Sequence, residues 1–358
     1  MVNLDNQTDC LALDSGQVGL AISLLPDQLS QVLQDFRHQP SWKLNKPVNK
    51  IVLNGMGGSN LGARLIVSAL ADKLQVPLLI EPGYTVPGYI DNQTLYIIST
   101  YSGTTEEPLS VIDQVQQRGA QLAALTADYP GNQLAEKARQ HNWPAYIFNP
   151  QYNPSGQPRL GLGYAIFGLL GLLANCHLVD FDLATAADLV VELQTTNQHW
   201  LPETPLTDND AKQLAQQLYG RQIWLIGPDC LTGNLHILRN QINETSKNLA
   251  NYLTVPDLNH YAMEGLSFPT NIPETIAILS FKITGLPDRL TKRLLLTDEV
   301  LEQNHLPVYN YQAAAANRLG QALEILAFGS WLSYYLGLLN GVDPVKIPWV
   351  DLFKKKLA

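Results

Sequence analysis

Residues 51–62, with the sequence IVLNGMGGSNLG, restrict the possible folds of this chain more than any other segment. An apolar, β-branched run stops abruptly at glycines, which is typical of a buried parallel strand that ends in a turn. Glycines let the backbone come close to a bound anion, and the start of a following helix offers unsatisfied N–H groups. The segment therefore predicts a strand, an anion-binding turn and a helix within an α/β protein.

The same alternation of strands and helices continues along the chain and then starts again in its second half. The other predicted strands lie near residues 76–81, 94–100, 121–126, 222–227, 253–255 and 275–280. The predicted helices cover residues 61–73, 106–118, 133–141, 211–219 and 231–249. Strands that alternate with helices predict doubly wound parallel sheets, here two of them.

A chain of 358 residues is long enough for two such domains. Residues 1–45 are predicted to be an N-terminal helical arm, and residues 46–180 a first domain that binds phosphate. Residues 181–210 form a helical, proline-containing linker, and residues 211–358 a second domain with C-terminal helices and a basic tail.

The composition favours a buried enzyme with a small-molecule partner. The formal charge of −9 comes from 23 basic and 32 acidic residues, and such a surface repels nucleic acid and anionic membranes. Two apolar runs, residues 160–179 and 319–342, contain glycines or polar residues and are predicted to be buried helices, not membrane spans. Neither a CxxC pair nor a secretory signal is present, which favours the cytoplasm and excludes a thiolate zinc site.

Hydroxyl side chains gather at the end of the predicted strand 94–100. Ser99, Thr100, Ser102, Thr104 and Thr105 lie within seven residues, around a glycine. Ligands of open α/β sheets bind at the carboxyl ends of the strands, so this cluster predicts a phosphate cradle beside the glycine turn. Helix capping would explain some of these residues but not five of them.

A dinucleotide site is the alternative interpretation of the glycine turn. Glu81 ends the next predicted strand, where a ribose-binding carboxylate would stand. However, the third glycine of a G-x-G-x-x-G motif would fall on Asn60. The hydroxyl cluster therefore favours a phosphate site.

The two motifs, GMGGS and TYSGTT, resemble those of the sugar-isomerase (SIS) domain. They are most similar to the bifunctional phosphoglucose/phosphomannose isomerase family, whose motifs are close to GMGGS and SYSGNTEE. The resemblance implies two flavodoxin-like SIS domains and a phosphate contacted by a set of six residues. These are Gly57, Gly58, Ser59, Thr100, Ser102 and Thr105, with Thr100 in place of the usual serine.

Aldose–ketose isomerisation needs a base that moves a proton between C1 and C2, a group that opens the sugar ring, and a cation near the enediolate. Taken alone, Glu244, His260 and Arg159 are more often an ion-pair partner, a solvated loop histidine and a helix-flanking charge. The family resemblance covers all of them, in the segments NETSK, PDLNH and PRLGLG, and extends to the C-terminal FKKKL.

By position, the resemblance implies Glu244 as the base, His260 and Lys354 as the ring-opening groups, and Arg159 as the cation. The choice of Lys354 over Lys355 and Lys356 rests on register. The resemblance implies neither a metal nor a cofactor. It also implies a homodimer in which the histidine comes from the neighbouring subunit.

Two further functions fit a chain with SIS domains. A non-catalytic sugar-phosphate sensor would need an output module, and the sequence contains neither a helix-turn-helix pattern nor a basic patch. An aminotransferring isomerase would need a glutaminase domain with a cysteine at its processed terminus, and Cys10 is not so placed.

Acceptance of mannose 6-phosphate besides glucose 6-phosphate stays open. Residues 342–353 contain no serine or threonine, so this segment offers no hydroxyl contact to the sugar.

Overall fold

The computed structural model describes residues 2–39 and 41–357. The chain divides into two compact units. The first unit is Leu24–Val191, and the second combines Met1–Ser23 with Glu192–Ala358. The helical arm is thus divided: α1 and α2 belong to the second unit and α3 to the first.

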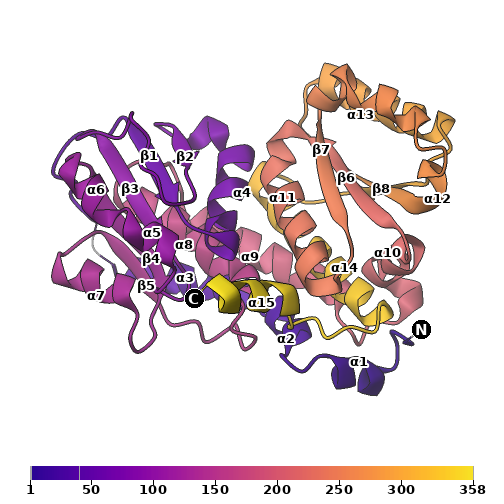
Figure 1. Ribbon diagram of the computed structural model, residues 1–358, viewed down its shortest axis with the longest axis horizontal. Helices are drawn as coiled ribbons and strands as arrows, with labels where there is room; N and C mark the ends of the chain where they lie inside the picture. The colour runs from indigo at the N-terminus through magenta and orange to yellow at the C-terminus, as the bar shows by residue number, and fades with distance from the viewer. Residues whose placement is uncertain (1, 40, 358) are drawn as a thin grey trace. The chain divides into compact units, whose positions relative to one another are not determined.

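The first unit is built on a five-stranded parallel sheet in the order β2-β1-β3-β4-β5 (Figure 1). Its strands are β1 (Lys50–Asn54), β2 (Leu78–Ile80), β3 (Thr94–Ser99), β4 (Gln121–Ala127) and β5 (Ala145–Phe148). Its helices are α3 (Leu25–Arg37), α4 (Leu61–Ala69), α5 (Glu106–Ser110), α6 (Ile112–Gln117), α7 (Gln133–Gln140) and α8 (Leu162–Asn175), with 3₁₀ turns η1 (Gly57–Asn60), η2 (Ala71–Lys73) and η3 (Pro158–Leu160). Strand β5 is an element that the sequence pattern does not predict.

Both faces of this sheet are covered. Val52, Tyr96 and Ala124 point to the face that packs against α6 and α7. The alternate residues of the strands are also buried, and α8 packs on that side together with α3 and α4. Burial on both faces explains why the strands are almost wholly apolar and not alternating.

The second unit holds a four-stranded parallel sheet in the order β7-β6-β8-β9. Its strands are β6 (Gln222–Pro228), β7 (Ala250–Val255), β8 (Ile276–Lys282) and β9 (Val308–Gln312). Its helices are α1 (Gln7–Leu13), α2 (Val18–Ser23), α10 (Asp210–Leu218), α11 (Thr232–Gln241), α12 (Ile272–Thr275), α13 (Asp288–Gln303), α14 (Arg318–Leu339) and α15 (Pro348–Leu357). The boundary between the units falls within α9 (Leu183–Asn197). The 3₁₀ turns η4 (Gln198–Trp200) and η5 (Leu206–Asp208) lie between α9 and α10, and η6 (Asp229–Leu231) lies between β6 and α11.

The prediction of two parallel-sheet α/β domains is confirmed. Among the described residues, α14 alone is long and apolar enough to cross a membrane, and its apolar stretch is entirely buried within the protein. It carries Glu324, whose carboxylate accepts hydrogen bonds from the Tyr311 hydroxyl and the backbone N–H groups of Ala314 and Ala315. These donors stabilise a carboxylate that would otherwise be costly to bury. The two apolar runs are therefore core helices, as predicted.

Candidate active site

The order of the first sheet reverses between β1 and β3, and both phosphate-type motifs follow these two strands. Asn54 pairs with Ile98, so the two strands end at nearly the same level. In sheets of this order, ligands bind at the carboxyl ends of the strands where the order reverses. The glycine turn after β1 and the hydroxyl cluster after β3 therefore share the edge of the sheet where a ligand is expected.

Three hydroxyl groups converge after β3. The Oγ1 atoms of Thr100 and Thr105 lie 2.6 Å apart, and Ser102 Oγ lies 3.4 Å from the first and 3.5 Å from the second. Thr105 stands at the N-cap of α5, but its side chain makes no capping hydrogen bond. Capping thus does not explain the cluster, and the three hydroxyls form a small hydrogen-bonding surface suited to phosphate oxygens.

The turn that carries these hydroxyls depends on Gly103. Its φ of +71° lies in the left-handed region, and a Cβ there would stand 1.8 Å from Asn132 Oδ1. Asn132 in turn donates to Thr126 Oγ1 at 2.7 Å and to the carbonyl of Ala127 at 2.6 Å. The backbone of the cluster is therefore held against the end of β4, and any side chain at position 103 would collide with this support.

Ser59 joins the glycine turn to the hydroxyl cluster. Its hydroxyl accepts a hydrogen bond from the Tyr101 N–H at 3.0 Å, and its carbonyl accepts from Ser99 Oγ at 2.7 Å. Tyr101 is buried, which raises the pKa of its phenol well above the usual value, and the group stays neutral. The two motifs thus form one connected structure.

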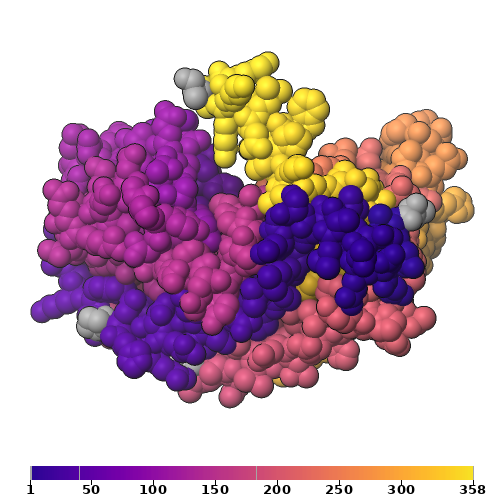
Figure 2. Space-filling view, turned by 90° about the horizontal axis from the view of Figure 1, so that it is seen from below, coloured from indigo at the N-terminus to yellow at the C-terminus, as the bar shows by residue number. Residues whose placement is uncertain are grey.

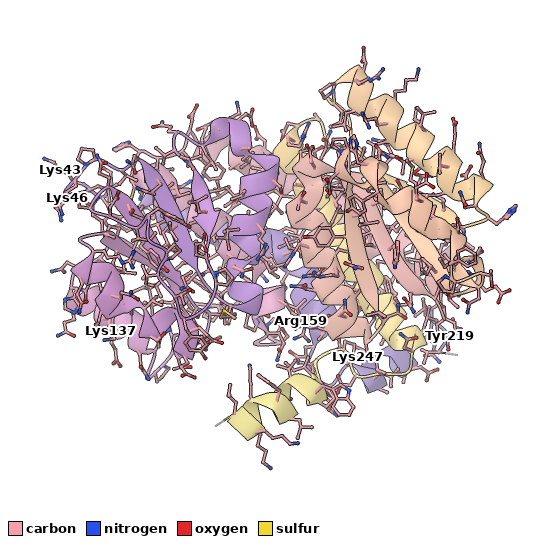
Figure 3. The ribbon with its side chains drawn as sticks, turned by 45° about the horizontal axis from the view of Figure 1, so that its top comes forward. Lys43, Lys46, Lys137, Arg159, Tyr219 and Lys247 are labelled. Atoms are coloured by element: carbon pink, nitrogen blue, oxygen red, sulfur yellow. The ribbon has the colours of Figure 1, made fainter. Side chains whose placement is uncertain are left out.

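Arg159 lies beside the glycine turn. A Cβ on Gly58 would come within 2.8 Å of the Arg159 backbone nitrogen, so only glycine allows this turn to pack against η3. The Arg159 side chain is 3% exposed, and its Nη1 donates to Gln157 Oε1 at 2.8 Å. The first unit therefore holds the backbone of Arg159 against the phosphate-type turn, just before the start of α8, and the side chain is buried (Figure 3).

Glu244 lies in a π-helical turn, η7 (Ile242–Ser246), in the second unit. The predicted α-helix over residues 231–249 is wrong in its last part, because α11 ends at Gln241 and β7 already begins at Ala250. The Asn243 side chain donates to the carbonyls of Arg239 and Ala250 and so fixes the turn between helix and strand. Isolated π-turns occur often at functional sites, and this one leaves the Glu244 side chain half-buried.

Lys247 ends this turn in the left-handed conformation, with a φ of 54°. Its ammonium donates to the carbonyl of Asp343 at 2.6 Å and to that of Pro344 at 3.3 Å. The Glu244 turn is thereby tied to the chain segment that leads into α15. Sequence reasoning assigned Lys247 no role of its own, although the spacing from Glu244 marks it as part of the NETSK motif.

His260 is exposed and lies at the opposite end of β7 from Glu244. It closes the 3₁₀ turn η8 (Asp257–His260), which follows the carboxyl end of β7. The six residues of β7 span about 20 Å. Within one chain, the Glu244 turn therefore lies at the amino ends of the strands of the second sheet, and His260 lies at their carboxyl ends.

The His260 turn is supported by helix α13. The Asn259 side chain donates to Thr297 Oγ1 at 2.8 Å and accepts from Arg293 Nη1 at 3.3 Å. Leu258 is buried in the core beneath. The histidine is thus presented outward from a fixed turn, not from a loose loop.

Lys354 lies in α15, where it is exposed together with Lys355 and Lys356. A single chain therefore leaves open which lysine acts, and the assignment of Lys354 stays a prediction. Among the described residues, no group of three or more His, Cys, Asp or Glu side chains gathers as a metal site would require.

Glu81 is the residue that would bind ribose if the glycine turn were a dinucleotide site. Its carboxylate accepts a hydrogen bond from the Tyr89 hydroxyl.

Comparison with known proteins finds related isomerases. Residues 207–357 match the bacterial phospho-glucose isomerase C-terminal SIS domain. A bifunctional phosphoglucose/phosphomannose isomerase of Caldicellulosiruptor bescii is 28% identical over 339 residues, covering 93% of this chain and 97% of the relative. The enzyme of the same name from Thermoplasma volcanium is 26% identical, covering 93% and 99%.

Solved structures share the fold. A hypothetical protein from Thermus thermophilus superposes with a TM-score of 0.70 at 16% identity, covering 98% of this chain and 94% of that one. A glucose-6-phosphate isomerase like protein from the same organism gives a TM-score of 0.58 at 18% identity, covering 99% of each chain.

The relatives identify the chain as an isomerase, and its two parallel-sheet units are SIS-like, the second of them matching the SIS family model. The resemblance that the motifs indicate is confirmed: over most of its length the chain is similar to the bifunctional phosphoglucose/phosphomannose isomerases.

Proposed function

We propose that this isomerase interconverts glucose 6-phosphate and fructose 6-phosphate through a cis-enediol, without a metal ion. The observation that carries the proposal is the triangle of hydroxyls from Thr100, Ser102 and Thr105, which Ser59 connects to the glycine turn packed on Arg159. The backbone of Gly57 and Gly58 completes the phosphate site. Thr100, including its extra methyl, is fully buried.

The roles of the four reacting side chains follow the family pattern. The Glu244 carboxylate takes the proton from C2 of the aldose, and the conjugate acid returns it to C1. Arg159 stabilises the negative charge that develops on the enediolate oxygens. His260 and Lys354 open the sugar ring by moving the proton between the ring oxygen and the C1 hydroxyl.

The active form is a homodimer in which Glu244 and His260 of one site come from different chains. The placement of the two residues at opposite ends of β7 supports this proposal, because one chain cannot bring them to the same sugar without unfolding the strand between them. We also propose a cytoplasmic location. An enzyme of this kind acts on phosphorylated sugars, and its three cysteines form no disulfide, as is usual in a reducing compartment.

The test of the function is a coupled assay with fructose 6-phosphate that detects glucose 6-phosphate and mannose 6-phosphate separately. Product formation is expected to survive exhaustive treatment with EDTA, because a carboxylate, an imidazole and two cations supply the whole chemistry. Activity that is lost in EDTA and restored by a divalent ion would contradict the metal-free mechanism. Tight binding of sugar phosphates without turnover would favour the alternative function, a non-catalytic sugar-phosphate sensor. Detection of mannose 6-phosphate in the same assay shows whether both glucose 6-phosphate and mannose 6-phosphate are accepted.

The phosphate site makes a separate prediction. Replacing Ser102 with alanine and Thr105 with valine should mainly raise KM, since each hydrogen bond to a charged phosphate is worth roughly 1.5–3 kcal/mol. The loss of two such bonds corresponds to a rise of at least about 100-fold. Steady-state kinetics measure it, with Ser110→Ala, an exposed hydroxyl at the end of α5, as the control. An unchanged KM would show that these hydroxyls do not contact the phosphate.

A further inference from the structure

The second unit contains a cavity that the proposed chemistry does not use. Its volume is about 580 Å³, and it lies between helices α1 and α2, residues 201–203 and the part of α14 that carries Trp331 and Tyr334. All of these elements belong to the same unit. Sites for small molecules commonly have volumes of roughly 300–1,000 Å³. We call this space the arm cavity, and its size suits a small ligand.

The walls of the arm cavity offer a large apolar surface. Leu11 of α1 and Leu20 of α2 line it and are 68% and 49% exposed, so they stand at its mouth. Trp331 and Tyr334 line its inner end, where both are almost fully buried. The indole N–H of Trp331 already donates to Asn197 Oδ1 at 2.8 Å, so this ring presents apolar surface. The walls therefore favour a ligand with an apolar body.

The charged groups on these walls are all negative. Asp14 and Glu203 line the cavity, and none of its lining residues is a lysine, arginine or histidine. Burial raises the pKa of the Tyr334 phenol and of the Cys10 thiol above their usual values, and both groups stay neutral. Two carboxylates beside aromatic rings attract a cation through its charge and through the faces of the rings. The charged end of the ligand is therefore positive.

Neither carboxylate is neutralised by a lysine. The buried ammonium of Lys212 donates to Asp5 Oδ1 at 2.9 Å and to two carbonyls of residues 202–204, so Asp5 balances its charge. Asp14 accepts hydrogen bonds from two backbone N–H groups of α2, one on each oxygen, at 2.8 Å. Each of its oxygens keeps a lone pair for a further donor. Glu203 is exposed, so its carboxylate can turn towards a ligand.

The segment that carries Asp14 is connected to the Glu244 turn. Ser15 Oγ donates to Asp343 Oδ2 at 2.5 Å, and Lys247 Nζ donates to the carbonyl of Asp343 at 2.6 Å. Figure 2 shows the N-terminal residues, drawn in indigo, lying against the yellow C-terminal segment. A ligand that joins α1, α2 and residues 201–203 therefore also stabilises the support of the Glu244 turn.

We propose that the arm cavity binds an organic cation with an apolar body, and that the bound cation activates the isomerase. Its protonated amine meets Asp14 and Glu203, and its apolar part lies between the two leucines and the aromatic inner end. The activation rests on the proposed function, whereas the binding does not.

The first test uses three probes of the same shape and different charge: 4-phenylbutylamine, 4-phenylbutan-1-ol and 4-phenylbutyrate. Isothermal titration calorimetry on the native chain is expected to show the amine binding about 10-fold more tightly than the alcohol, because hydrogen bonds between charged groups are the stronger ones. The carboxylate should not bind. Equal affinities for amine and alcohol, or no binding of the amine at millimolar concentration, would overturn the proposal.

The second test changes exposed residues, which keeps the fold intact. Glu203→Gln should weaken binding of the amine about 3-fold, the effect of an exposed ion pair, and leave binding of the alcohol unchanged. Leu11→Arg, which adds a cation at the mouth, should weaken the amine further. The control is Glu302→Gln on α13 of the same unit. Amine binding that neither substitution weakens would place the site elsewhere, and equal losses for amine and alcohol would exclude the charge contact.

The third test measures activation. A saturating concentration of the amine should raise kcat/KM for fructose 6-phosphate about 5-fold, the lower end of typical coupling between sites. Ser15→Ala, which removes the hydrogen bond to Asp343, should keep amine binding and lose this increase. Binding without any increase in the native chain would overturn the activation.

Calorimetry needs no turnover, so it separates this inference from the proposed function. If the amine binds selectively but fructose 6-phosphate is not converted, the site stands and the proposed function fails. If fructose 6-phosphate is converted but the amine does not bind, the arm cavity is excluded as a site while the proposed function stands.

Discussion

Glu244→Gln is expected to lower kcat by at least ~100-fold, the loss that removal of a general base typically causes. Glutamine keeps the size of the side chain and its hydrogen-bonding capacity, so the π-turn around it should persist. The amide cannot accept the proton from C2, and the fall should therefore appear in kcat while phosphate binding is retained.

The measurement is steady-state turnover of fructose 6-phosphate, accompanied by circular dichroism and by binding of a non-reacting sugar phosphate. Glu302→Gln, at an exposed position of α13, is the matched control and should turn over normally. Near-normal turnover of Glu244→Gln itself would place the base elsewhere, and Glu264 would be the next residue to replace.

The sheet that carries the phosphate-type motifs could be predicted well from the sequence. Its central strands are buried on both faces, so their apolar runs are long and end sharply at glycines or hydroxyls. Strand β5 was missed because AYIF is short and follows a tryptophan and a proline, which hide its pattern. Strand β9 was missed as well, because VYNYQ lies at the edge of its sheet and only one of its residues, Tyr311, is buried.

The environment of the candidate base could not be predicted. Residues 231–249 lack proline and have the composition of a continuous helix, yet the chain turns at Glu244. The cause is tertiary: α14 approaches so closely that a Cβ on Gly337 would stand 2.9 Å from the Thr245 carbonyl, and Asn340 donates to the Ser246 carbonyl. These contacts join segments about 90 residues apart, and the hydrophobic pattern of residues 231–249 cannot predict them.

The predicted catalytic residues remain predictions, and they differ in how far the structure supports them. Arg159 has a clear structural setting, since Gly58 and η3 place it next to the phosphate-type turn. Lys354 has no comparable structural setting in a single chain, because every residue of α15 is exposed to solvent.

Mixing two inactive variants is expected to restore activity if the sites are shared. Glu244→Gln and His260→Ala are prepared as separate homodimers, then unfolded and refolded together so that their subunits exchange. In a heterodimer, one site receives intact Glu244 from the His260→Ala chain and intact His260 from the Glu244→Gln chain. Its second site lacks both residues. Random mixing makes half of the dimers heterodimers, so activity should rise towards about a quarter of the native value.

The separation of the two residues along β7 makes this outcome decisive. If both acted on a sugar bound to one chain, every site in the mixture would lack one of them, and no activity would return. Native mass spectrometry on variants of distinct mass shows whether heterodimers have formed. Each variant refolded alone gives the background. Heterodimers without recovered turnover would exclude the shared site.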